Sequence, residues 1–126
     1  MFKKDFPHIT QPDTMECGAT CLRMIAQYYG KKYSAETMQR LCRVTREGVS
    51  MLSLSDAAEE LGFRSVCGRI SLERVVEQRP FPCILYWNQA HFVVLYDVKK
   101  KRKGKLRFRI ADPGKNLLEL DEDTVR

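Results

Sequence analysis

The apolar positions in the first half of the chain recur at the spacing of α-helices. The first stripe consists of Leu22, Ile25, Ala26 and Tyr29, and Gly30 follows it as a stop signal. These four side chains lie on one face of a single helix, so the pattern predicts a long first helix that ends near residue 30.

Two shorter helices are predicted downstream. The second is expected to begin after the cap candidate Ser34. The third is expected over residues 53–61, with Ser53 and Asp56 as a capping box and Gly62 as its end. The apolar stripes hold Met38, Leu41 and Cys42 in the second helix, and Leu54, Ala57, Ala58 and Leu61 in the third.

The second half of the chain has the pattern of strands. Residues 63–70 predict one strand, and residues 83–87 and 91–96 predict two more that are separated by a short turn at 88–90. Residues 105–111 alternate between apolar and cationic side chains, as a half-buried strand does. A short helix with the stripe Leu72, Val75 and Val76 is expected after the first strand. Helices followed by an antiparallel sheet indicate an α+β domain.

The length of 126 residues fits one domain, spanning residues 1–126. With 44% hydrophobic and 30% charged residues, the composition is that of a globular domain and excludes intrinsic disorder. Its apolar runs are far shorter than the ~20 residues that a membrane-spanning helix needs. The amino terminus lacks the apolar segment of a secretory signal. The odd count of five cysteines excludes a complete disulfide framework and favours free thiols in a reducing compartment.

The formal charge of +6 comes from one segment. Residues 99–109 hold eight basic groups and no acidic group, while the rest of the chain carries 14 basic and 16 acidic groups. A solvated hairpin tip, whose cations discourage edge-to-edge pairing of strands, explains this run, and an anionic partner is the alternative. Nucleic-acid binding is disfavoured, because Phe108 is the single aromatic residue in the segment.

Cys17 is the candidate nucleophile because it lies where the first long helix begins. Backbone N–H groups and the helix dipole stabilise an anion at that end, and therefore favour a thiolate. Gly18 removes bulk beside the sulfur, so we expect it to let a substrate carbonyl come close. A buried structural cysteine is the alternative interpretation.

His91 and Asp112 are candidate partners of this thiol. His91 opens an apolar strand directly after a turn, whereas His8, the other histidine, lies in a loop without a comparable setting. A hairpin places the start of one strand beside the end of the next, so we expect Asp112 to be a neighbour of His91 and to orient its ring. A hydrogen-bonded core histidine and a simple Asp-Pro-Gly turn are the alternatives.

Gln11 lies six residues before Cys17, in a loop that can fold back across the helix start. Its amide can donate to an oxyanion together with the Cys17 backbone N–H. A zinc site at Cys17 and Cys21 is weakly supported, since no second cysteine pair accompanies them. The other thiols lie in apolar patterns and are expected in the core: Cys42, Cys67 and Cys83.

These motifs resemble the bacteriocin-processing cysteine peptidases. The resemblance rests on Gln11, on Glu16-Cys17-Gly18, on the run from His91 to Leu95 and on Asp112-Pro113, in that order. It implies a papain-like fold with amino-terminal helices packed on a carboxy-terminal antiparallel sheet. It further implies Cys17 as nucleophile, His91 as general base and acid, Asp112 as orienter and Gln11 as oxyanion donor.

The resemblance also implies a biological setting. Members of this family cut the leader of a secreted peptide precursor after a Gly-Gly pair, on the cytosolic side of the membrane. They are typically the amino-terminal domain of an ABC transporter. We therefore expect a domain excised from a larger exporter whose transmembrane and nucleotide-binding parts, with their ATP, are missing. The peptidase itself is expected to need no cofactor or metal. The alternatives are a domain that docks leader peptides without cutting them, and acyl transfer to an amine by the same triad.

Overall fold

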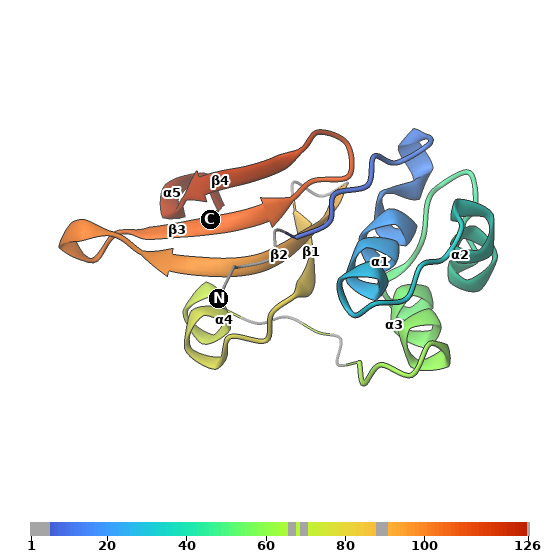
Figure 1. Ribbon diagram of the computed structural model, residues 1–126, viewed down its shortest axis with the longest axis horizontal. Coiled ribbons are helices and arrows are strands. Elements are labelled where there is room, and N and C mark those ends of the chain that lie inside the picture. The colour runs from blue at the N-terminus through green and yellow to red at the C-terminus, as the bar shows by residue number, and fades with distance from the viewer. Residues whose placement is uncertain (1–5, 66–67, 69–70, 88–90, 126) are drawn as a thin grey trace.

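The computed structural model describes residues 6–65, 68, 71–87 and 91–125. Within these ranges a group of helices lies at one end of the molecule and an antiparallel sheet extends away from it (Figure 1). No helix in the described part of the chain is both long enough and apolar enough to cross a membrane. The helices-then-sheet order predicted from the sequence is confirmed.

The helical part begins with a 3-10 turn, η1 (Thr14–Glu16), which leads directly into α1 (Cys17–Tyr28). Next comes α2 (Ala35–Cys42), whose predicted cap is confirmed, because the Ser34 hydroxyl accepts the Thr37 backbone N–H at 3.1 Å. The predicted end of α1 is confirmed as well, since the chain turns at Gly30 with a φ of +92°.

The third helix, α3 (Met51–Glu60), begins earlier than the sequence predicted. The expected capping box at Ser53 and Asp56 is wrong. The cap is Ser50, which has extended backbone and accepts the Ser53 N–H at 3.0 Å. Ser50 and Ser53 share the same three-residue spacing to a polar side chain, so the local pattern alone did not separate them.

The strand predicted at residues 63–70 is absent from the described part of that segment, where residues 63–65 and 68 join no strand. Phe63 instead turns back on the helices, with its N–H bonded to the Ala58 carbonyl and its ring 5.6 Å from that of Tyr29. Residues 66, 67, 69 and 70 lie outside the described residues. The short helix predicted next is confirmed as α4 (Leu72–Gln78).

The sheet has four antiparallel strands in the order β1-β2-β3-β4. They are β1 (Cys83–Trp87), β2 (His91–Lys100), β3 (Leu106–Ala111) and β4 (Leu117–Asp121). A 3-10 turn, η2 (Arg102–Gly104), joins β2 to β3, and α5 (Glu122–Val125) follows β4. The strands predicted at 83–87, 91–96 and 105–111 are confirmed, whereas β4 and α5 were not predicted. The turn expected at 88–90 lies outside the described residues.

Both faces of the sheet are covered. Phe92 and Val94 of β2 belong to the larger core, which they share with α1, α2 and α3. The alternate residues Val93 and Leu95 belong to a second core, where they pack with Val75 of α4. Because both faces of β2 are buried there, its first half is a continuous apolar run.

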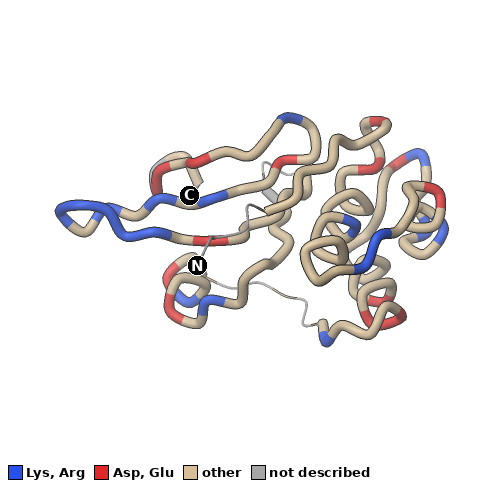
Figure 2. Tube along the Cα trace, viewed as in Figure 1, with Lys and Arg blue, Asp and Glu red and all other residues tan. Residues whose placement is uncertain are grey.

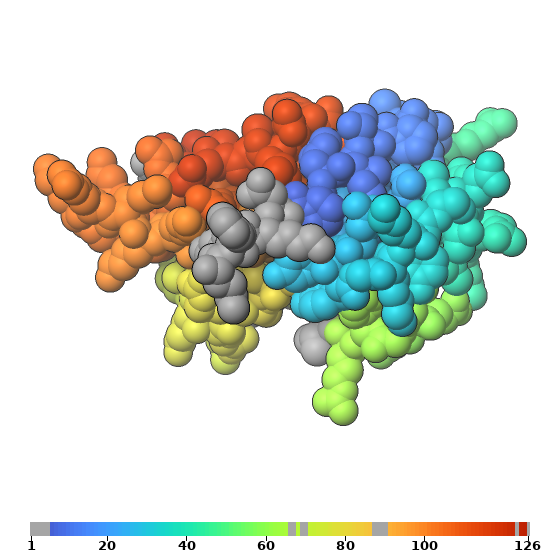
Figure 3. All heavy atoms as spheres, viewed as in Figure 1, coloured from blue at the N-terminus to red at the C-terminus, as the bar shows by residue number. Residues whose placement is uncertain are grey.

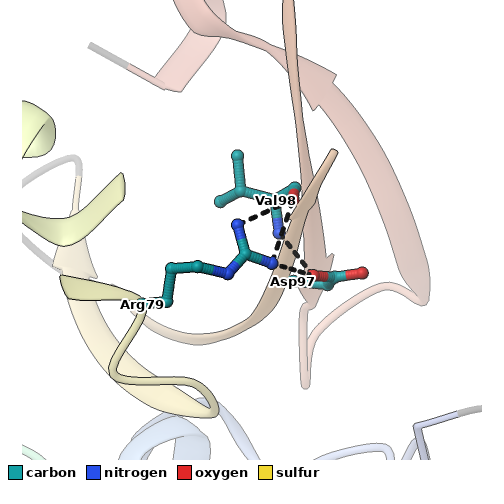
Figure 4. A network of polar contacts seen from close by, with 3 residues as sticks. All are labelled: Arg79, Asp97 and Val98. Atoms are coloured by element: carbon teal, nitrogen blue, oxygen red, sulfur yellow. Dashed lines mark hydrogen bonds and ion pairs between the residues drawn. The ribbon is translucent and has the colours of Figure 1, made fainter. Parts of the chain in front are cut away.

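A bulge at Tyr96 shifts the register between β2 and β3, because Leu95 pairs with Ile110 but Asp97 pairs with Arg109. Arg79, at the end of α4, binds the chain just beyond this bulge. Its guanidinium donates to Asp97 Oδ1 at 3.1 Å and to the Val98 carbonyl at 3.4 Å (Figure 4). These bonds join the end of α4 to β2 just beyond the bulge.

Candidate active site

Cys17 is the first residue of α1 and is 7% exposed. The 3-10 turn before it is held by Asp13, whose carboxylate accepts the Met15 N–H at 2.9 Å. Cys17 therefore stands in the first turn of a twelve-residue helix, where the backbone N–H groups of the helix start are concentrated. Such groups have no partner inside the helix and favour a negative charge nearby, which is the setting that a thiolate needs.

Gly18 has a packing role rather than the role expected from the sequence. A methyl group at this position would lie 2.5 Å from Val49 Cγ1 and 3.2 Å from Leu54 Cδ1. The space beside Gly18 is therefore filled by the protein's own side chains. Gly18 allows α1 to pack against Val49, and the expectation that it opens a path for substrate is wrong.

His91 and Asp112 are hydrogen-bonded to each other. His91 Nε2 lies 2.6 Å from Asp112 Oδ1, with the Asp112 side chain 4% exposed and that of His91 28% exposed. The Gly114 backbone N–H donates to the same Oδ1 at 2.9 Å. The carboxylate is thus held in place from the turn that follows it, and the Nδ1 side of the His91 ring faces away from this bond.

The helix start and the His91 end of β2 are in contact. The residues that follow Cys17 and His91 are Gly18 and Phe92, and a methyl group on Gly18 would lie 3.1 Å from Phe92 Cδ2. Cys21, one turn after Cys17, has its thiol pKa raised by burial and, further, by the nearby Cys17 and Asp112. The candidate nucleophile and the His91–Asp112 pair are therefore on the same side of the molecule.

The segment before α1 crosses the end of β3. His8 Nε2 donates to the Asp112 carbonyl at 2.7 Å, and the Gln11 backbone N–H donates to the Pro113 carbonyl at 2.8 Å. Sequence reasoning dismissed His8 because nothing local distinguishes it. Its partner lies 104 residues away along the chain, so no local pattern could have revealed this contact.

Gln11 also brings its side chain to the site. A methyl group on Gly114 would meet three of the candidate side chains at once: Asp112 Oδ1 at 3.4 Å, Gln11 Oε1 at 3.5 Å and His91 Cε1 at 3.6 Å. Gln11 Nε2 donates one hydrogen to the Asp13 carbonyl at 2.8 Å. Its Oε1 is buried and, among the described residues, has no hydrogen-bond partner. This oxygen is an acceptor, so a bound group that completes its bonding must be a donor, whereas an oxyanion can accept only from Nε2.

The other thiols that the structure describes have structural settings. Cys17, Cys21, Cys42 and Cys83 are free, and no group of three or more His, Cys, Asp or Glu side chains in the described ranges could hold a metal ion. Burial raises the pKa of Cys42 and of Cys83 to about 12. Cys67 lies outside the described residues. Cys42 is fully buried, as expected, and Cys21 is fully buried too. Cys83, which was also expected in the core, is only partly buried and packs against the core from the edge strand β1.

An apolar pocket of about 400 Å³ lies between α1, α3 and β1. Leu22, Ile25 and Leu54 contribute to its lining, and Tyr29 at its rim is 55% exposed. An exposed large aromatic side chain beside a concave apolar surface is typical of a binding site. This pocket does not include Cys17 or His91, so it is a second feature of the surface rather than the reaction centre itself.

The family of the chain follows from comparison with known proteins. The model of the Peptidase C39 family matches residues 5–126, which is nearly the whole chain. The chain belongs to the Peptidase C39 family. This is a family of cysteine peptidases, and the resemblance noted from the sequence motifs is therefore confirmed.

Two relatives of this C39 domain come from Escherichia coli. The chain is 33% identical over 101 residues to a probable microcin-H47 secretion/processing ATP-binding protein and 30% identical over 124 residues to the colicin V secretion/processing ATP-binding protein. These matches cover 80% and 98% of the chain. The chain spans only 14% and 17% of the length of these relatives.

Solved structures show the same fold. The crystal structure of a double glycine motif protease from an AMS/PCAT transporter, in complex with its leader peptide, matches with a TM-score of 0.85 and 34% identity. That match covers 93% of this chain and 80% of the other. The peptidase domain of Streptococcus ComA matches with a TM-score of 0.71 at 20% identity, covering 96% and 90% of the two chains. The α+β, papain-like fold predicted from the sequence is thus confirmed.

Proposed function

We propose that this C39 domain is a cysteine endopeptidase that cuts the leader of a secreted, bacteriocin-like peptide precursor after a Gly-Gly pair. The observation that carries the proposal is the partly buried His91–Asp112 hydrogen bond of 2.6 Å on the side of the molecule where Cys17 begins α1. A nucleophile at a helix start, a histidine and an orienting carboxylate are the parts that thiol peptidases require.

The proposed triad divides the reaction among its residues. His91 takes the proton of the Cys17 thiol, the resulting thiolate attacks the carbonyl carbon of the second glycine, and the carbonyl oxygen becomes an oxyanion. His91, oriented by Asp112, then gives its proton to the departing amine as the C–N bond breaks, which leaves a thioester on Cys17. His91 next takes a proton from water, the resulting hydroxide attacks the thioester, and the thiol is regenerated as the leader leaves.

Gln11 is the proposed side-chain donor to the oxyanion, together with the Cys17 backbone N–H. One amide hydrogen of Gln11 bonds to the Asp13 carbonyl, and the second remains for a substrate oxygen. If it acts in this way, Gln11→Ala lowers kcat by roughly 10²–10³-fold. Gln11→Glu, which keeps the shape but replaces the amide donor by a carboxylate, is expected to be at least as damaging.

Recognition of the leader is proposed to occur away from the reaction centre. Glycines at the cut have no side chains to recognise, so specificity must come from residues further upstream in the leader. The apolar pocket between α1, α3 and β1 offers a place for such side chains. Tyr29→Ala, at its rim, should then raise KM with kcat unchanged, because it removes binding that is equal in the ground and transition states.

The proposed setting is a larger exporter. Both Escherichia coli relatives are named as secretion/processing ATP-binding proteins, and this chain corresponds to a small part of each. We propose that residues 1–126 form one peptidase domain that works beside the transmembrane and nucleotide-binding domains of an ABC transporter, at the cytoplasmic face of the membrane. Peptide hydrolysis by this domain then needs no cofactor of its own, and ATP is used by the nucleotide-binding domain.

The test is direct mapping of a cut. The chain is incubated with synthetic peptides that carry a double-glycine leader, and the products are identified by mass. Cys17→Ala is expected to abolish cleavage while still binding the peptide. Cys42→Ala, which removes a buried thiol from α2, away from both Cys17 and the apolar pocket, is the matched control and should keep the activity.

Three outcomes would contradict the proposal. Undiminished turnover by Cys17→Ala would overturn the mechanism. Tight peptide binding by the unmodified chain without any cut would favour a domain that docks leaders only. A product in which the leader is joined to an amine would indicate acyl transfer rather than hydrolysis.

A further inference from the structure

The cationic segment forms the end of the β2–β3 hairpin. Its six cations between residues 99 and 105 extend from the last residues of β2 through the 3-10 turn. Figure 2 shows the cations gathered at the tip of the sheet, interrupted by an uncharged stretch in the turn, and the hairpin projects from the body in Figure 3. The charge that makes the whole protein basic is therefore concentrated on one protrusion.

Acidic residues lie opposite the arginines at the base of the hairpin, whereas the tip extends past the last strand residue of β4. On β3, Arg109 pairs across the sheet with Glu119, and Arg107 pairs with Asp121, which is the last residue of β4. Lys101 lies 3.7 Å from Glu119, in a contact that is about half exposed on both sides and hence weak. Lys100, Arg102 and Lys105 are exposed beyond the end of β4.

The tip is far from the proposed reaction centre. His91 is the first residue of β2, and Lys100 is the tenth and last. At ~3.3 Å per residue, the two ends of this strand are separated by about 30 Å. A partner bound at the tip therefore leaves the Cys17 side of the molecule open to a peptide.

We propose that this hairpin tip binds the anionic phospholipid headgroups of a membrane surface. Lysines supply most of the charge, and as mobile point charges they suit a field of many phosphates rather than one oriented group. Phe108 is fully buried, so the segment offers no ring on which a nucleic-acid base can stack. The inference rests on the proposed function, because a domain of an exporter lies next to a membrane.

The probe is a sedimentation assay with lipid vesicles. The chain is mixed with vesicles of phosphatidylcholine alone or of phosphatidylcholine and phosphatidylglycerol in equal parts. Binding is expected with the mixed vesicles only, and it should vanish in 1 M salt, where charges are screened over ~3 Å. The variant Lys100→Gln/Arg102→Gln/Lys105→Gln should partition about 100-fold less, since each such cation contributes roughly a fivefold gain.

The matched control removes the same charge from the helical part of the molecule. Lys31→Gln/Lys32→Gln/Arg40→Gln alters three exposed cations there and should change vesicle binding by less than about tenfold. Cleavage of a double-glycine peptide in solution is measured in parallel for all three proteins. It should be equal in all of them, because neither set of substitutions touches the site.

The two readouts separate the two proposals. Vesicle binding without cleavage would remove the peptidase function and leave the lipid contact standing. Equal loss in both variants, or no binding of the unmodified chain to the mixed vesicles, would overturn the lipid contact. Tighter binding to a single-stranded oligonucleotide than to the vesicles would also overturn it in favour of a nucleic acid.

Discussion

His91 Nε2 is hydrogen-bonded to Asp112 Oδ1, the same oxygen that accepts the backbone N–H of Gly114. The imidazole is therefore oriented by an acceptor that is itself fixed from the backbone. An asparagine at position 112 could place its amide oxygen on the Gly114 N–H and still offer that oxygen to His91. Asparagine and alanine at position 112 are therefore expected to affect catalysis differently.

Asp112→Asn should consequently be milder than Asp112→Ala. Replacing a charged acceptor by a neutral one is expected to lower kcat by about tenfold, whereas removing the acceptor should lower it by about 100-fold. Steady-state cleavage of a double-glycine peptide measures kcat for both variants. Equal loss in the two variants would show that the charge, rather than the orientation of the ring, is what matters.

His8 should act as a positioning residue for Asp112. The His8→Ala variant loses the bond to the Asp112 carbonyl, and we expect it to lower the free energy of unfolding by about 1 kcal/mol in a urea titration. It should also lower kcat with little change in KM, because the proposed action of this ring is on Asp112 rather than on the substrate. His8→Gln, which keeps a side-chain donor, should restore kcat, and a failure to do so would argue against positioning through this bond.

Gly18→Ala should destabilise the protein by about 1–3 kcal/mol, the usual cost of overpacking. The added methyl group would lie 2.5 Å from Val49 Cγ1. Val49→Ala in the same chain should recover part of the loss by making room. Gly68→Ala is the control, since a methyl group there meets nothing within 4 Å. If Gly18→Ala is as stable as the control but fails to cleave, the glycine serves the substrate after all.

The structural thiols should resist alkylation in the folded protein. Burial raises the pKa of Cys42 and Cys83 to about 12, so at pH 10 only about one per cent of each is thiolate. In the Cys17→Ala background, iodoacetamide should therefore leave both unmodified as the pH rises from 7 to 10, and peptide mapping by mass assigns each site. Urea should make both reactive, since unfolding returns the pKa to its ordinary value of 9.0. Rapid labelling without urea would contradict their burial.

Much of the fold was predictable because its signals are local. Some signals depend only on residues a few positions apart along the chain. These are the cap at Ser34, the stop at Gly30 and the alternation along β3. The antiparallel hairpin was predictable too, since two strands joined by a short turn must lie side by side. That topology alone predicts that the candidate residues His91 and Asp112 lie near each other.

Tertiary structure decided what depends on residues far apart in the sequence. The partner of His8 lies 104 residues away, the bulge at Tyr96 follows from pairing with β3, and Gly18 is required by Val49 of a different segment. The sequence by itself determined which side chains could do the chemistry and at which end of each element they lie. Only folding decided which atoms hold them there, because hydrogen bonds and van der Waals contacts depend on distance in space, which the order of residues leaves open.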